Sequence, residues 1–207
     1  MSWTILGLAV VGVIIWLANG IRQMGTVSIG EPIGNQPKTA LLLIDLQTAF
    51  WNAGTFTEKA KEKAKEQILA EVEAAKADGI PVIGVRHEWS IPSTKAIAKL
   101  LGKGLAVEGT PGTELISPLD TLADHTMVKR VQDAFETKEL DKFLKQLDVG
   151  KLRIVGLDTN YCVAKTALAA RQRGYEVEIV SQAVLTADQN KAEQTLEMLQ
   201  NKQVTLR

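Results

Sequence analysis

A cysteine, an aspartate and a lysine, far apart in the chain, have side chains suited to nucleophilic catalysis. Cys162 is the only cysteine, and a cysteine without such partners is most often a small buried hydrophobe. It lies where a predicted helix begins, and the partial positive charge of a helix N-terminus lowers the pKa of a thiol. Asp45 is suited to accept the thiol proton, and Lys129 to stabilise the charges that result. The three are candidates for one site if the fold brings them together.

The elements that must position these residues alternate between strands and helices. Short apolar runs indicate strands buried on both faces, and apolar residues at helical spacing indicate helices that cover them. Repeated strand–helix units predict a three-layer α/β/α fold with a mainly parallel, Rossmann-like sheet of five or six strands. The predicted strands are 40–45, 80–85, 125–130, 151–157, 176–180 and an edge strand at 204–206, and the predicted helices are 57–78, 139–147, 161–173 and 189–200, with a long loop over 107–119.

The candidate residues follow different strands of this predicted sheet. Asp45 ends the first strand, Lys129 lies at or near the end of the third, and Cys162 follows the fourth. His87 and Trp89 follow the second strand. In open α/β sheets, ligands bind at the carboxyl ends of the strands, near a reversal of strand order. The topology therefore predicts that these residues converge on one edge of the sheet.

Composition excludes several other classes of protein. The chain has 207 residues, of which 45% are hydrophobic, and its 24 basic residues balance its 24 acidic ones. The apolar content excludes disorder, and the neutral balance gives no electrostatic argument for nucleic acid. One cysteine excludes a disulfide framework and any multi-cysteine metal site, and two histidines argue against a histidine-rich metal centre. No glycine fingerprint of a dinucleotide site follows the first strand, and no phosphate-binding loop sequence occurs.

The N-terminal segment differs sharply from the rest of the chain. Residues 1–21 carry no charged side chain, and Trp3 and Trp16 lie near the ends of an apolar run long enough to cross a bilayer. We predict a transmembrane anchor helix over 1–21, a Gly/Pro-rich linker over 22–37 and a hydrolase domain over 38–207. A basic residue directly after the anchor favours a single-pass protein with a cytoplasmic domain. A cleaved signal peptide and a buried helix remain as alternatives.

Three separated motifs resemble the isochorismatase-like cysteine hydrolases, in that family's order. They are ALLLIDLQTAFW from Ala40, HTMVKRVQDAF from His125, and IVGLDTNYCVAKTALAARQRGYEVEIVSQAV from Ile154. The resemblance covers about residues 38–185. It implies the three-layer α/β/α fold and a catalytic triad that falls on Asp45, Lys129 and Cys162.

The resemblance also implies a mechanism. Asp45 accepts the proton of Cys162 while Lys129 tunes both groups, and the thiolate attacks an amide-type carbonyl to give a thioester that water cleaves. The family's cis peptide falls on the bond between Leu157 and Asp158, and we expect it to aim the Asp158 N–H beside the Cys162 N–H as an oxyanion hole. One such donor contributes about 2.7–4 kcal/mol to lowering the barrier.

Aromatic residues near the strand ends are candidates for the substrate pocket. We expect Phe50, Trp51 and Trp89 to wall it, with core packing as the alternative for each. Thr159 and Tyr161 flank the nucleophile and are candidates to line the same pocket.

The identity of the substrate stays open at this stage. Nicotinamidases of the family hold a metal ion with an Asp and His residues, but the matching segment here, VRHEWS from Val85, lacks the Asp-x-His pattern. We therefore predict no metal and no other cofactor. Family members that cleave the vinyl ether isochorismate do not depend on the cysteine, and they remain an alternative, as does a catalytically silent, membrane-tethered binding domain. The resemblance further implies a small-molecule substrate and a homo-oligomer.

Overall fold

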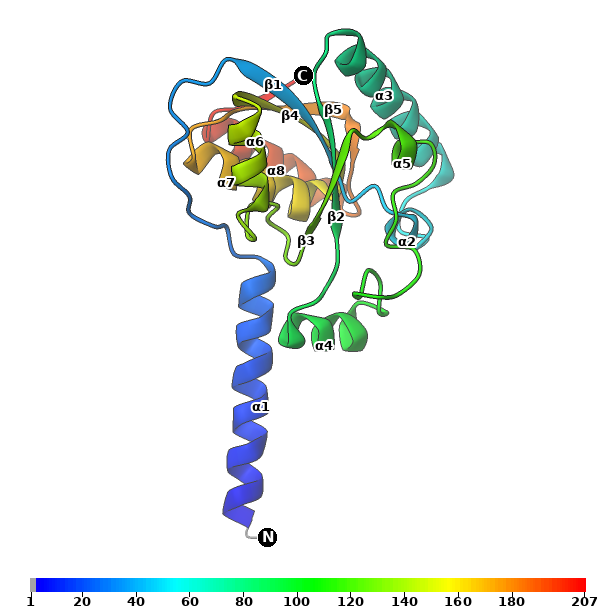
Figure 1. The fold of residues 1–207 in the computed structure, drawn as a ribbon. Helices are drawn as coiled ribbons and strands as arrows, with labels where there is room; N and C mark the ends of the chain where they lie inside the picture. Colours follow the sequence, from blue (N-terminus) through cyan, green and yellow to red (C-terminus); the bar gives the residue numbers. More distant parts are fainter. Residues whose placement is uncertain (1–2) are drawn as a thin grey trace.

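A parallel six-stranded sheet forms the centre of the protein. The computed structural model describes residues 3–207. Every neighbouring pair of strands is parallel, and their spatial order is β3-β2-β1-β4-β5-β6 (Figure 1). This confirms the predicted three-layer fold, with six strands. The strands are β1 (Lys38–Ile44), β2 (Val82–His87), β3 (His125–Lys129), β4 (Val149–Leu157), β5 (Glu176–Leu185) and β6 (Val204–Leu206).

Helices cover both faces of the sheet because its central strands are apolar on both sides. Leu42 and Ile44 of β1 pack in a core cluster with α6, α7 and α8, whereas Leu41 and Leu43 pack in a second cluster with α3 and α5. Such side-to-side alternation is the period of a strand. The helices of the domain are α2 (Thr48–Trp51), α3 (Glu58–Ala77), α4 (Pro92–Leu101), α5 (Leu119–Leu122), α6 (Glu139–Gln146), α7 (Ala164–Gln172) and α8 (Gln189–Asn201), with a π-helical turn, η1 (Thr159–Val163), before α7.

Several parts of the domain differ from the sequence predictions, among them the end of β5 and the helix α4. β5 continues to Leu185, five residues beyond its predicted end, because Val184 and Leu185 pair again with β4 after a break in register. The helix α4 was not predicted. It begins with a proline in its first turn, which is a helix-start signal, but it is only 10 residues long.

The N-terminal helix α1 (Trp3–Met24) projects from the domain, with its N-terminal end far from the sheet (Figure 1). It is long and apolar enough to cross a membrane, and few of its residues are buried. Its contact with the domain lies near its C-terminal end, where Gly20 packs against Ser93 and Ile97 of α4 so closely that a Cβ at Gly20 would lie 2.7 Å from Ile97 Cδ1. Met1 and Ser2 of the predicted anchor lie outside the described residues.

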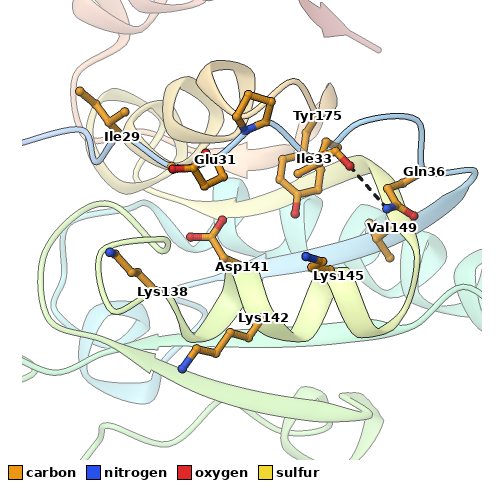
Figure 2. Close-up of a pocket in the computed structure, with 12 residues that line it drawn as sticks. Ile29, Glu31, Ile33, Gln36, Lys138, Asp141, Lys142, Lys145, Val149 and Tyr175 are labelled. Atoms are coloured by element: carbon orange, nitrogen blue, oxygen red, sulfur yellow. Dashed lines mark hydrogen bonds between the residues drawn. The ribbon is translucent and has the colours of Figure 1, made fainter.

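The segment from residue 25 to residue 37 runs along the domain surface without regular structure. The Ser28 N–H donates to Asp133 Oδ2 at 2.7 Å, and the Ile33 N–H donates to the carbonyl of Arg173 at 2.9 Å. A cavity of about 300 Å³ lies between this segment and α6. Asp141 and Tyr175 are among its lining residues (Figure 2). The first three residues of the predicted linker, 22–24, are the last turn of α1.

Candidate active site

The carboxyl ends of four strands bring the candidate residues together. The chain order of the strands reverses at β1, which lies between β2 and β4, and such a switch point is where open α/β sheets bind ligands. Asp45 directly follows β1 in the left-handed backbone region, with φ of 53°. His87 ends β2, Lys129 ends β3, and Cys162 lies in η1 after β4. The predicted convergence on one edge is therefore observed.

The ammonium group of Lys129 lies at the centre of this group, which we call the Lys129 cluster (Asp45, His87, Lys129 and Cys162). All four side chains are buried. The cation has more acceptors around it than its three N–H bonds can serve at once. Lys129 Nζ lies 3.0 Å from Asp45 Oδ2, 3.1 Å from Cys162 Sγ, 2.6 Å from His87 Nδ1 and 3.2 Å from the carbonyl of Val131.

Sequence reasoning assigned no definite role to His87, which the structure places in the cluster. Burial and the nearby Lys129 charge lower the pKa of His87 well below its ordinary value, so the ring is neutral. Its Nδ1 then accepts from Lys129 and its Nε2 carries the hydrogen. Gln47 fixes the strand end, because its side chain accepts from the His87 N–H at 2.6 Å and donates to the His87 carbonyl at 3.0 Å. The only sequence signal was the position of His87 at a strand end.

Burial and charge set the protonation states of the other three groups. Burial raises the pKa of Asp45, although the Lys129 charge and hydrogen bonds with Lys129 and Cys162 oppose the shift. Burial favours neutral Lys129, but the charge of Asp45 and the hydrogen bonds with Cys162 and Asp45 together outweigh burial and raise the pKa of the lysine. Lys129 is therefore a cation in the resting protein, and its Nζ lies 3.0 Å from the Asp45 carboxyl group.

The pKa of the Cys162 thiol shifts in the opposite direction to the one expected from the sequence. We expected a helix N-terminus to lower its pKa, but burial, followed by the charge of Asp45, raises the pKa of Cys162. Cys162 is the fourth residue of η1 and is buried, so the desolvation of a thiolate outweighs the helix dipole. The thiol is thus protonated at rest and needs a base, and its hydrogen bond to Asp45 provides one.

A cavity of about 220 Å³ opens beside the cluster and includes some of the predicted pocket residues. Phe50, Trp89 and Tyr161 line it together with Asp45 and Cys162. The Trp89 ring contacts the His87 ring in a tilted arrangement, with 3.8 Å between centroids and 55° between the ring planes. The cavity is therefore lined both by aromatic rings and by residues of the Lys129 cluster.

Two further predicted pocket residues do not line this cavity. The Trp51 ring packs against the core cluster that contains α3. Thr159 is buried, and its hydroxyl donates to the carbonyl of Leu185 at 3.0 Å. Both side chains point into the fold.

The backbone between β4 and η1 has the expected conformation. The bond between Leu157 and Asp158 is cis, and Asp158 lines the cavity. The Asp158 carboxylate accepts from the N–H groups of Asn160 at 2.8 Å and Ala187 at 2.7 Å, which fixes this turn. An oxyanion hole built from the Asp158 and Cys162 N–H groups stays a prediction.

Three residues of the Lys129 cluster are also of types that bind metal ions. Oxygen, nitrogen and sulfur atoms of Asp45, His87 and Cys162 lie within 4.8 Å of one another. However, the Lys129 ammonium lies between them, at hydrogen-bond distance from all three. A metal ion at this position would replace or repel that cation. His125, the second histidine, begins β3, at the opposite end from Lys129. The described residues therefore do not fit a catalytic metal at this site.

Sequence and structure comparisons identify proteins to which this chain is similar. The family described as the isochorismatase domain matches residues 39–207. A probable inactive nicotinamidase of Arabidopsis thaliana is 31% identical over 168 residues, covering 72% of this chain and 81% of the relative. An uncharacterised isochorismatase family protein of Bacillus subtilis is 28% identical over 148 residues, covering 72% of this chain and 74% of the relative.

A solved structure, the pyrazinamidase/nicotinamidase of Streptococcus mutans, superposes with a TM-score of 0.72 at 25% identity, covering 82% of this chain and 100% of that one. The family match begins after β1 has started, so α1 and residues 25–37 lie outside it. Together with the sheet topology and the residues at its carboxyl edge, these similarities identify the chain as a member of the isochorismatase family of hydrolases.

Proposed function

We propose that the protein is a cysteine hydrolase of a small amide-type substrate, and that Asp45, Lys129 and Cys162 carry the reaction. The observation that carries this proposal is the contact of one buried cation, Lys129, with both the carboxylate and the thiol. A nucleophile within reach of a base that a third group orients is the usual signature of covalent catalysis. The solved relative from Streptococcus mutans is named as an amidase of this kind.

In the first step, Asp45 accepts the thiol proton of Cys162, and the thiolate attacks the substrate carbonyl carbon. The Lys129 charge stabilises the anion that moves from the carboxylate to the sulfur, since Nζ is 3.0 Å from Asp45 Oδ2 and 3.1 Å from Sγ. The backbone N–H groups of Asp158 and Cys162 are proposed to donate to the oxyanion, which contributes about 2.7–4 kcal/mol per donor.

In the second half of the reaction, protonated Asp45 gives its proton to the departing amine, and a thioester on Cys162 remains. Asp45 then removes a proton from water, which attacks the thioester and releases the carboxylic acid. The sulfur leaves as a thiolate and takes the proton back from Asp45, which restores the thiol and the carboxylate, so protons and bonds balance over the cycle. His87 holds Lys129 in place throughout, because its neutral Nδ1 accepts from Nζ.

The cavity favours a small substrate with a planar or apolar part. Its volume of about 220 Å³ is small, and Phe50, Trp89 and Tyr161 provide faces for stacking. Hydrolysis of a vinyl ether is the second candidate activity, and a silent binding domain is the third. The complete set of hydrogen-bonded reactive groups favours amide hydrolysis, since neither alternative requires the thiol.

We also propose that α1 anchors the enzyme in a membrane, with the domain in the cytoplasm. The support is the length and apolarity of α1, which is exposed along most of its length, and Arg22 at its C-terminal end. We also predict that the protein is a homo-oligomer. Measuring its molecular mass in detergent would test this prediction.

The catalytic proposal is tested by measuring ammonia release from a panel of small primary carboxamides. Cys162→Ala and Asp45→Asn are each expected to abolish turnover, whereas Asp148→Asn, which changes an exposed aspartate at the other edge of the sheet, leaves it unchanged. Mass spectrometry of the intact, acid-quenched enzyme is expected to find an acyl adduct on Cys162. Turnover that survives Cys162→Ala would contradict the mechanism.

A further inference from the structure

The helix α4, which lies close to the active site, has two adjacent exposed leucines at its C-terminal end. Leu100 and Leu101 are 72% and 77% exposed. Among the described residues outside α1, they are the only neighbouring pair of large hydrophobic side chains that are both this exposed. Lys99 and Lys103 flank the pair and are exposed as well. Adjacent exposed aliphatic residues mark a surface that contacts something apolar.

The position of α4 relative to α1 indicates what that contact is. Gly20 of α1 packs against Ser93 and Ile97 of α4, and the two helices cross at a large angle, with α4 at the level of the C-terminal end of α1 (Figure 1). From Trp3 to Gly20 the helix rises about 26 Å, at roughly 1.5 Å per residue, which is close to the hydrocarbon thickness of about 30 Å. If α1 spans a bilayer, α4 lies at the membrane–water interface.

The charges on and beside α4 suit such an interface. Within α4, both charged residues are lysines, Lys95 and Lys99, and Lys103 follows in the next turn. Lys95 is paired with Glu108, but Lys99 and Lys103 project from the surface next to the exposed leucines. Lysine stems and leucines favour the headgroup region together, where acidic lipids attract the ammonium groups.

Residues that line the catalytic cavity are connected to α4 and to α1. Leu105, four residues beyond α4, lines the cavity, and Trp89 is bridged to Val107 of the same loop. On the side of α1, the N–H of the cavity residue Gln132 donates to the Met24 carbonyl, the last of α1, at 3.0 Å. Cavity-lining residues are therefore connected to both α4 and α1, the two helices that meet at the proposed membrane interface.

We infer that α4 is an interfacial helix, and that its Leu100–Leu101 pair and its lysines dock the domain on an acidic phospholipid surface, which holds the catalytic cavity next to the bilayer. This inference rests on the proposal that α1 spans the membrane, but not on the hydrolytic mechanism. A domain connected only through α1 would tumble above the membrane, whereas docking through α4 gives it one orientation.

The test measures the depth of single positions in vesicles of phosphatidylcholine and phosphatidylglycerol. The full chain carries Cys162→Ser, so that a nitroxide label attaches only at an introduced cysteine. Labels are placed by Leu101→Cys on α4, Val13→Cys in the middle of α1, and Ile29→Cys, an apolar side chain that is 83% exposed and lies five residues beyond the end of α1. The readout is the ratio of collisions with oxygen, which concentrates in lipid, to collisions with a water-soluble nickel chelate.

We expect the highest ratio at position 13, the lowest at position 29, and an intermediate ratio at position 101. Adding Lys99→Glu and Lys103→Glu is expected to lower the ratio at position 101 several-fold, whereas Lys142→Glu and Lys145→Glu on α6 leave it unchanged. A high ratio at 13 with equal ratios at 101 and 29 would overturn the docking of α4 and keep the anchor. A low ratio at 13 would overturn the anchor and the docking together, while leaving the hydrolase proposal intact.

Discussion

Two buried cations, Lys129 and Arg173, occupy similar environments and have different consequences. Both side chains are almost completely buried, and each bonds an aspartate: Lys129 contacts Asp45 at 3.0 Å, and Arg173 contacts Asp141 at 2.6 Å. The Lys129 cluster borders a cavity at the carboxyl edge of the sheet. Arg173, after α7, lies under the segment that connects α1 to β1.

The two sites differ in how completely their polar atoms are paired. All three guanidinium nitrogens of Arg173 donate, to the carboxylate of Asp141, to the carbonyl of Ala169, and to both the carbonyl and the hydroxyl of Ser28. In the Lys129 cluster, Asp45 Oδ1 and His87 Nε2 are buried without a protein partner. A fully paired buried network stabilises a fold, whereas unpaired buried atoms are costly and call for another explanation. Here that explanation is a substrate or water in the adjacent cavity.

The largest expected effect comes from removing the cation of the Lys129 cluster. Lys129→Met leaves Asp45 buried without its counter-charge, so the carboxyl takes up a proton and can no longer act as a base. We expect kcat/KM for a hydrolysed carboxamide to fall by roughly 10³-fold or more, as when other members of catalytic units are removed. Steady-state ammonia release measures the loss, with Lys142→Met as the control. Retained activity would show that Lys129 has only a structural role.

Removing the second cation is expected to damage stability and spare the chemistry. Arg173→Met leaves Asp141 and the Ser28 carbonyl without their donor, and breaking one side of a buried pair costs about 3–5 kcal/mol. Urea unfolding measures this loss, and kcat/KM is expected to stay close to the original value at temperatures where the variant is folded. Lys38→Met, which removes an exposed pair with Asp148, provides the control at about 0–1 kcal/mol. A stable but inactive Arg173 variant would refute the contrast between the two sites.

The pH dependence of activity is expected to report the Lys129 cluster. Burial raises the pKa of Asp45, so the base becomes protonated at a higher pH than an ordinary aspartate, whose pKa is about 3.9. Below this raised pKa, kcat/KM is expected to fall about tenfold per pH unit, since one proton blocks one base. The profile is measured with a substrate that does not titrate. An acid limb at or below the ordinary value would contradict the assignment of Asp45.

The same shift predicts a stability effect of definite sign. Because folded Asp45 binds its proton more tightly than unfolded Asp45, its contribution to stability is fully present below the unfolded pKa and is lost as pH rises through the folded pKa. Asp45→Asn should remove this part of the pH dependence of the free energy of unfolding, whereas Asp148→Asn should leave it.

The smallest effect is expected where the connecting segment crosses Arg173. A Cβ at Gly30 would lie 2.5 Å from Arg173 Cζ, so the guanidinium must shift. We expect Gly30→Ala to cost about 1–3 kcal/mol of stability, as overpacking does elsewhere, without changing kcat/KM. Gly25→Ala is the matched control, because the nearest atom to its Cβ would lie at 3.7 Å. Equal stability of the two variants in thermal unfolding would show that Arg173 adapts freely.

The sheet and the three reactive residues were predictable because they depend on local patterns. Apolar runs mark buried strands, parallel connections place their carboxyl ends at one edge, and Asp45, Lys129 and Cys162 follow three of those ends. The same reasoning from strand ends predicted pocket positions for Trp89 and Tyr161, and both residues line the cavity.

The tertiary structure decided everything that depends on contacts between distant segments. Sequence spacing could not show that His87 pairs with Lys129, that Trp51 and Thr159 point into the fold, or that α4 packs on α1. It also predicted the wrong direction for the Cys162 pKa, because a helix terminus is visible in the sequence and burial is not. Residue types determine which chemistry is available, whereas desolvation and the direction of a side chain depend on the neighbours that folding supplies.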